Sequence, residues 1–265
     1  MQKNSSRIPA PTPKTMRCCC IALAGLVALS AAQTHPSLPT RWIAKTKEPG
    51  APKQFSVGTE AYNYVHEPTD ANPSSMWSNY TGCQRLISVV RRNNPNVNHR
   101  YLFGCDAVNC CYEPQGSTGG NQVEYQIPQT KIATKVTVTH STNDVTTAFE
   151  TVSAADTWTW KWGPIPLPKY QQTYNVYTTN PGSDDSTLVL HRWNVNTPIA
   201  TNFSLANIDF VNFTHVAPED QAAFDASFTR PTKEQCRIPC PSAVKQGLLK
   251  QETYDHLLGR PTLLL

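Results

Sequence analysis

The residues 156–162, DTWTWKW, carry a tryptophan at every second position. Side chains of a β-strand alternate between the two faces of its sheet, so Trp158, Trp160 and Trp162 share one face and the residues between them share the other. At the rise of a strand, the three indoles form an apolar wall about 13 Å long. This stretch therefore predicts a sheet with one strongly aromatic face.

The same two-residue period recurs on both sides of that stretch. It is clearest over residues 131–140, where Val136, Val138 and His140 share a face. Further strands are predicted over residues 55–65, 85–92, 122–128, 170–178, 186–195 and 208–216, and short helices over residues 218–226 and 242–258. So many strands do not fit one flat sheet, so we expect an all-β fold of two packed sheets or one curled sheet, with short helices near the C-terminus.

The N-terminal residues predict export. A basic segment without acidic residues leads into an apolar run over residues 18–32 that ends in small residues, which is the pattern of a signal peptide cleaved after Ala32; a signal anchor is the alternative. The predicted parts are a signal peptide (1–32), a flexible proline-rich lead-in (33–54), a β domain that binds ligand (55–241) and a helical tail (242–265). We expect a secreted protein, or one in an endomembrane lumen, that does not span a membrane.

Cysteine content agrees with export. The cysteines that follow the leader are Cys83, Cys105, Cys110, Cys111, Cys236 and Cys240. An even number in an oxidising compartment predicts three disulfides. The adjacent Cys110 and Cys111 point to opposite faces of an extended chain, so each should have a different distant partner, and at least one bond should reach the C-terminal pair. A zinc site is the competing interpretation, but the cysteine spacing is irregular and no paired histidines lie nearby.

Charge and sequons describe the expected surface. Four of the 23 basic residues and none of the 19 acidic ones precede Gln33, so the remaining chain carries equal numbers of both. Nucleic acid and anionic membranes are therefore not implied as partners. The sequons at Asn79, Asn202 and Asn212 predict N-glycosylation.

The sequence offers little for catalysis, because none of the familiar nucleophile, zinc-protease, phosphate-loop or dinucleotide motifs occurs, and we expect no enzyme. Asp184 and Asp185 follow a Pro-Gly turn and are candidates for calcium, although such a pair is more often simply solvated. No other cofactor or metal is expected.

The aromatic stripe is the best functional clue. Residues of neighbouring strands extend the wall, and the predicted ligand-binding set is Val136, Val138, Trp158, Trp160, Trp162, Tyr174, Val176 and Trp193. Three indoles in a row fill a closed sandwich awkwardly, since each is bulky and carries an N–H that needs a partner. They suit a cupped sheet that encloses a hydrophobic ligand, although an ordinary filled core is the simpler interpretation.

The chain resembles the ependymin-related secreted proteins over residues 55–240. The resemblance rests on Cys83, the Cys110–Cys111 turn before Val123-Glu124-Tyr125, the Trp-rich strand and the closing segment from Phe224 to Cys236. The Cys110–Cys111 doublet, Cys240 and the helical tail depart from the family pattern. The resemblance implies two stacked, curved antiparallel sheets enclosing a hydrophobic pocket. It also implies secretion or lysosomal delivery, glycosylation, calcium association and homodimers.

Three functions follow as hypotheses. The first is a non-enzymatic extracellular protein that holds a hydrophobic or lipid-like ligand between its sheets. The second is a β-sandwich carbohydrate-binding protein or glycosidase, in which open indoles stack on sugar rings and Glu124 and Glu150 are candidate carboxylates. The third is a structural matrix or adhesion module with a filled core. The surroundings of the tryptophan wall distinguish the three.

Overall fold

The computed structural model describes residues 36–49, 51–65, 68–90, 98–114, 136–162, 172–180, 182, 187–196, 204–217, 220–226 and 228–259. Its strands are β1 (Arg41–Lys47), β2 (Val57–Asn63), β3 (Ser74–Tyr80), β4 (Cys83–Val89), β5 (Asn98–Cys105), β6 (Val108–Tyr112), β7 (Thr139–Thr146), β8 (Thr151–Trp162), β9 (Gln172–Thr179), β10 (Val189–Asn196), β11 (Ser204–His215) and β12 (Ile238–Pro239). Its helical segments are η1 (Lys53–Phe55), α1 (Gln221–Ala226), α2 (Cys240–Lys245), α3 (Gln251–Tyr254) and η5 (Asp255–Gly259). The predicted all-β class with short C-terminal helices is confirmed.

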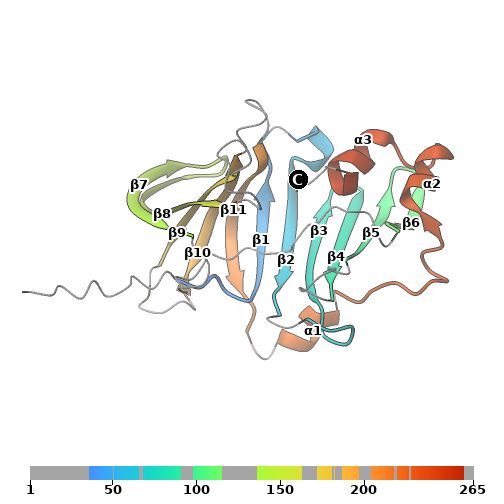
Figure 1. The fold of residues 1–265 in the computed structure, drawn as a ribbon, viewed down its shortest axis with the longest axis horizontal. Coiled ribbons are helices and arrows are strands. Elements are labelled where there is room, and N and C mark those ends of the chain that lie inside the picture. The colour runs from blue at the N-terminus through green and yellow to red at the C-terminus, as the bar shows by residue number, and fades with distance from the viewer. Residues whose placement is uncertain are drawn as a thin grey trace, which may run out of the picture. The chain divides into compact units, whose positions relative to one another are not determined.

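The strands form one hydrogen-bonded sheet in the order β12-β6-β5-β4-β3-β2-β1-β11-β10-β9-β8-β7 (Figure 1). All neighbours are antiparallel except β12, which runs parallel to β6. The chain thus builds one half outward from β1 to β6 and the other half from β7 inward to β11. Two packed sheets or one curled sheet were expected, and the described strands form one continuous sheet whose two halves meet where β1 pairs with β11.

The prediction of a flexible lead-in over residues 33–54 is corrected by the structure. These residues contain β1, which lies in the middle of the sheet. Trp42, Ala44 and Thr46 are 0 %, 1 % and 4 % exposed, while Ile43 and Lys45 between them face solvent. The segment alternates over only seven residues and is bordered by Pro39 and Pro49, which obscured its strand pattern in the sequence.

The remaining predicted strands are found with shifted ends, at β2, β4, β8, β9, β10 and β11, and β7 covers the end of the stretch predicted over 131–140. The strand predicted over 122–128 lies outside the described residues. Strands β3, β5, β6 and β12 were not predicted. The predicted helix over 218–226 corresponds to α1, whereas the predicted helix over 242–258 is broken into α2, α3 and η5, with Gly247 at a φ of +71° between the first two.

Two faces of the sheet carry separate apolar clusters. The face that bears Trp158 and Trp160, called the core face below, holds the largest cluster, which extends from β4 to β8. At the β3–β6 end, the C-terminal helical segments pack on the same face through Leu249, Leu257 and Leu258 (Figure 1). On the opposite face, α1 and the turn after it cover β2 and β4 with Phe224 and Phe228.

Three disulfides join Cys83 to Cys105, Cys110 to Cys236 and Cys111 to Cys240. The predicted separate partners for Cys110 and Cys111 are confirmed, and both lie in the C-terminal segment. These two bonds place β12 and α2 beside β6, which explains why a two-residue strand is held at the edge of the sheet.

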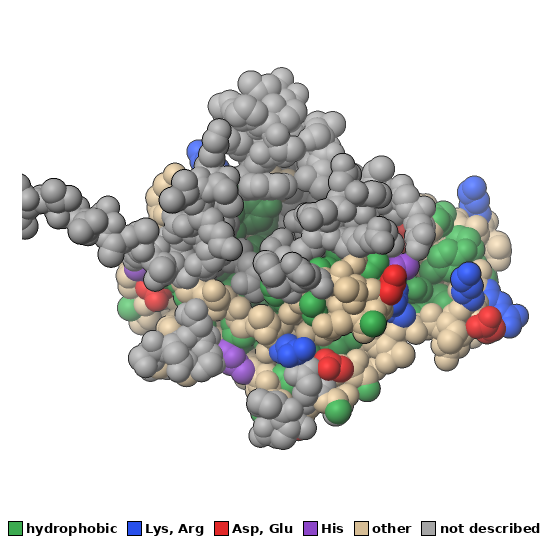
Figure 2. All heavy atoms as spheres, turned by 60° about the horizontal axis from the view of Figure 1, so that its bottom comes forward, with side chains coloured by type: hydrophobic (Ala, Val, Ile, Leu, Met, Phe, Trp, Pro, Cys, Tyr) green, Lys and Arg blue, Asp and Glu red, His purple; other side chains and the backbone are tan. Residues whose placement is uncertain are grey.

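The visible surface is mixed in charge. Figure 2 shows acidic and basic side chains interspersed on one face of the molecule, among many uncharged polar groups. Within the described residues, no helix has the length and apolar character needed to cross a membrane.

Candidate ligand-binding face

The tryptophans of β8 meet aromatic residues of the next two strands. Trp158 is opposite Val176, and Val176 is opposite Trp193, so these side chains form a row across three strands. The Trp160 ring stacks on Tyr174 with 5.0 Å between centroids, and it meets Trp193 edge-on at 5.7 Å. The predicted wall therefore extends sideways through β9 and β10.

A second group of rings, absent from the sequence prediction, continues the wall on β1, β2 and β11. Trp42 lies 5.3 Å from Tyr62, 5.6 Å from Phe210 and 5.0 Å from Phe213, measured between ring centroids. The register of β1 with β11 shifts between Ile43 and Lys45. The alternation of Trp42, Ala44 and Thr46 was the available signal in the sequence.

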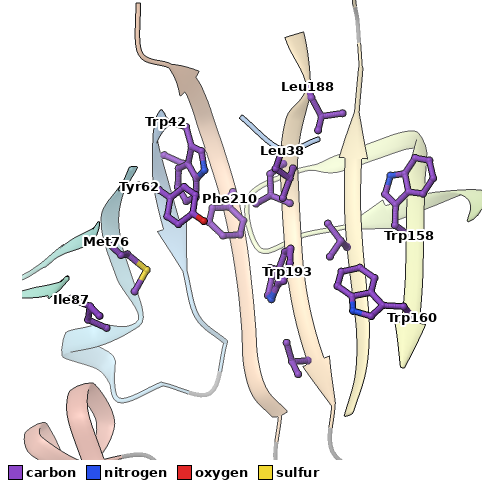
Figure 3. Close-up of a cluster of buried hydrophobic side chains, with 14 of the residues drawn as sticks. Leu38, Trp42, Tyr62, Met76, Ile87, Trp158, Trp160, Leu188, Trp193 and Phe210 are labelled. Atoms are coloured by element: carbon purple, nitrogen blue, oxygen red, sulfur yellow. The ribbon is translucent and has the colours of Figure 1, made fainter. Parts of the chain in front are cut away.

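Both groups belong to one contiguous apolar cluster on the core face. We define the aromatic cluster as Trp42, Tyr62, Trp158, Trp160, Tyr174, Trp193, Phe210 and Phe213. In Figure 3, the labelled side chains of β1 and β2 and those of β8 and β10 lie on the same side of the curved sheet. Met76 of β3 and Ile87 of β4 border the cluster at one end.

The rings are hidden from solvent. Trp158, Trp160 and Trp193 are 5 %, 4 % and 5 % exposed, and the Trp158 Nε1–H donates to Thr178 Oγ1 at 3.0 Å. A platform that stacks on sugar rings needs open indoles, so this burial argues against that alternative. Glu150, one of its candidate carboxylates, lies in the turn between β7 and β8, and Glu124 is outside the described residues.

Seven of the eight predicted ligand-binding residues are brought together on this face. Trp158, Trp160, Val176 and Trp193 are buried in the cluster, and Val136, Val138 and Tyr174 pack against it. Trp162 pairs with Gln172 at the end of β8, but its side chain is outside the described residues.

A charged group lies on the core face beside the aromatic cluster. Glu60 is opposite Ser78, and Ser78 is opposite Arg85, in a row across β2, β3 and β4. The Ser78 hydroxyl donates to Glu60 Oε1 at 3.3 Å, and Arg85 Nη2 donates to Ser78 Oγ at 3.0 Å. Burial is the largest cause that raises the pKa of the neighbouring Tyr80 phenol to about 12.

Arg100 and Glu113 form the outer part of this charged group, on β5 and just after β6. Arg100 Nη1 donates to the Leu258 carbonyl at 3.2 Å, and the Tyr254 hydroxyl donates to Glu113 Oε1 at 3.0 Å. Burial lowers the pKa of Arg100, and burial, followed by Glu113, raises the pKa of Tyr254 to about 12. The C-terminal helical segment thus contacts both members of this pair.

The predicted glycosylation and calcium sites do not belong to the aromatic cluster. The sequon residues Asn79 and Asn212 are exposed, while Asn202 lies outside the described residues, as do Asp184 and Asp185. No cluster of three metal-ligating side chains occurs among the residues that the structure describes.

Comparison of the chain with protein-family models, with curated proteins and with solved structures found no match. The resemblance to the ependymin-related family therefore stays a prediction.

Proposed function

We propose that this protein is a secreted, non-enzymatic glycoprotein that binds a lipid-like ligand against the core face of its sheet. The observation that supports the proposal most is the aromatic cluster, in which eight rings from six strands gather on one curved face. The resemblance to ependymin-related proteins favours the same function. Because the rings of β8 and β10 are buried, the ligand would lie within the protein and not on its surface.

The energetics suit such a ligand. Burying an acyl chain contributes on the order of 0.8 kcal/mol per CH2, or about 10 kcal/mol gross for a chain of about 14 carbons. Ordering the ligand and the protein costs part of this free energy. The remainder is enough for micromolar or tighter binding.

The test uses the full-length chain secreted from eukaryotic cells. Native mass spectrometry of the purified protein should detect a bound lipid, and organic extraction should release it. After delipidation, a fatty acid derivative carrying a bromine quencher should lower tryptophan emission in a saturable manner. A protein with no lipid in either measurement and no saturable quenching would instead have a filled structural core, and the proposal would be wrong.

Two matched variants locate the ligand. Trp160→Phe removes an indole of the aromatic cluster and should reduce the amplitude of the quenching. Trp77→Phe removes an indole on the opposite face, where Trp77 packs beside Ala61 and Leu86, and should leave the ligand-dependent change intact. Equal effects of both variants would place the ligand elsewhere.

A further inference from the structure

The charged group on the core face borders the apolar surface that the proposed ligand would occupy. Glu60 is opposite Ala44 and two residues from Tyr62, and both neighbours belong to the large apolar cluster. Arg85 is two residues from Ile87, another member. The row of Glu60, Ser78 and Arg85 therefore separates the aromatic cluster from the apolar cluster under the C-terminal helices.

This row is nearly inaccessible to water. Glu60 and Ser78 are 1 % and 0 % exposed, and the Arg85 side chain is 14 % exposed. Its ion pair, between Arg85 Nη2 and Glu60 Oε1, is 3.5 Å long, which exceeds the usual length of a charge-assisted hydrogen bond. Apolar residues of similar volume would stabilise a sheet core as well as a buried ion pair does, so the charges indicate a role other than stability.

The charged group has as many carboxylates as guanidinium groups, and the nearby Glu48 is paired with His256 at 3.7 Å. The group contains the carboxylates of Glu60 and Glu113 and the guanidinium groups of Arg85 and Arg100, and the second pair is contacted by the C-terminal segment. A ligand group placed beside Glu60 and Arg85 meets both hydrogen-bond donors and acceptors but no excess of either charge. A head group with a net charge would add an uncompensated charge in a region of low dielectric constant, which is costly.

We propose that Glu60, Ser78 and Arg85 bind the polar head group of the ligand, and that this head group is electrically neutral overall, as in a monoacylglycerol or a lysophosphatidylcholine. The acyl chain lies along the aromatic cluster, and the head group lies at the charged row. This inference rests on the proposed function and adds the ligand class that the site selects.

The first test compares probes with the same acyl chain on the delipidated full-length protein at pH 7.5. Oleate, monooleoylglycerol and oleoyl lysophosphatidylcholine compete with the brominated fatty acid, and tryptophan emission reports their binding. We expect both neutral probes to bind at least about tenfold more tightly than oleate. Equal or tighter binding of oleate would overturn the head-group assignment and leave lipid binding intact, whereas failure of all three probes would overturn lipid binding as well.

The second test changes the charge of the row. Glu60→Gln leaves Arg85 without its carboxylate. The affinity for oleate should therefore rise on the order of tenfold relative to the affinity for monooleoylglycerol. Arg85→Gln should lower the affinity for oleate relative to the affinity for monooleoylglycerol. Glu150→Gln is the matched control, because it removes a carboxylate whose side chain is 47 % exposed, and it should leave the ratio unchanged.

Circular dichroism in the near ultraviolet confirms that each variant keeps its packing. If Glu60→Gln is not secreted in a folded form, the probe ranking of the unmodified protein and the ratio for Arg85→Gln still decide the proposal. A folded Glu60→Gln protein that binds all probes with the original ratio would overturn it.

Discussion

At the scale of single residues, Asp209 joins two distant parts of the sheet on the face opposite the core face. Its carboxylate is completely buried and accepts two hydrogen bonds from Arg192, one from Nε and one from Nη2 at 3.0 Å. It also accepts one from the Ala148 backbone N–H at 2.7 Å. Arg192 additionally donates to the Thr146 carbonyl at 3.0 Å. Strand β11 thereby holds the tip of the β7–β8 hairpin, although three strands, β10, β9 and β8, lie between β11 and β7 in the sheet order.

Replacing Asp209 with Asn should therefore loosen this hairpin. We expect Asp209→Asn to lower the free energy of unfolding by about 2 kcal/mol, since Arg192 would lose its counter-ion in a largely buried position. The loss should be below that of a wholly buried pair, because the Arg192 side chain is 21 % exposed. Urea denaturation followed by tryptophan emission measures the change.

Asp70→Asn provides the control. Asp70 pairs with Arg230 at 3.5 Å, but its side chain is 83 % exposed, so its removal should change stability by less than about 0.5 kcal/mol. If Asp209→Asn had no larger effect than Asp70→Asn, the Asp209–Arg192 contact would not be what holds the hairpin.

At the scale of elements, two disulfides attach the C-terminal segment to β6. They link residues 126 and 129 positions apart and begin at adjacent cysteines. Once either bond has closed its long loop, the other closes only a small ring between the cysteine doublet and residues 236–240. The loop-entropy model therefore assigns about 5 kcal/mol to the first bond and only about 2 kcal/mol to the second.

Removing one of these bonds should thus cost much less than removing both. We expect Cys110→Ala/Cys236→Ala to lower the free energy of unfolding by about 2 kcal/mol, and the quadruple variant to lower it by about 7 kcal/mol. The variant that lacks Cys111–Cys240 should lose somewhat more than the first, since both of these cysteines are fully buried and their truncation leaves a cavity. Urea denaturation under non-reducing conditions provides the comparison.

The Cys83–Cys105 bond is the internal control. It closes a separate loop of 22 residues, so its removal should cost about 3 kcal/mol and add to either of the other losses. If each single-bond variant of the C-terminal pair lost about 5 kcal/mol, the two bonds would act independently and the shared-loop argument would be wrong. This comparison stands even if the quadruple variant is not secreted.

The same elements show what the sequence could and could not predict. The alternation around Trp158 and Trp160 identified β8 because bulky apolar residues occupy consecutive core-face positions there. Strand β3 was missed because small Ser74 and Ser78 occupy core-face positions together with Met76, so its pattern lacks contrast. The place of β1 depends on long-range pairing with β11, which local periodicity does not reveal.

At the scale of the whole molecule, the sequence predicted that the core face is aromatic, but it did not predict how many strands contribute to that face. The eight predicted ligand-binding residues lie in one continuous part of the chain, from Val136, just before β7, to Trp193 on β10. The rings of Trp42 and Tyr62 join them only because β1 pairs with β11, which brings the N-terminal strands beside the C-terminal half of the sheet. The charged row was not predicted, since Glu60, Ser78 and Arg85 are single polar residues in three separate strands. Their proximity is a property of register alone.

Acid should destabilise the protein as a whole, because two histidines on distant strands, the buried His191 and the partly buried His99, have the same response to pH. Burial is the main cause that lowers the pKa of His191 on β10 and of His99 on β5 below the ordinary value of 6.5. Between pH 6.5 and the lower pKa of the folded state, the unfolded chain binds protons that the folded protein does not. The free energy of unfolding therefore falls as the pH falls through this range and is fully retained above it.

The variant His99→Gln/His191→Gln tests this argument, since glutamine keeps a polar side chain that does not titrate. At pH 7.5 the variant should unfold at a urea concentration close to that of the unmodified protein, apart from the loss of the His191 contacts with Thr179 Oγ1 at 2.8 Å and with Glu150 Oε1 at 3.5 Å. Between pH 6.5 and 5 its free energy of unfolding should decrease less steeply. An unchanged slope would assign the acid sensitivity to other groups. The expected slope makes the protein more stable in neutral extracellular fluid than in an acidic lumen.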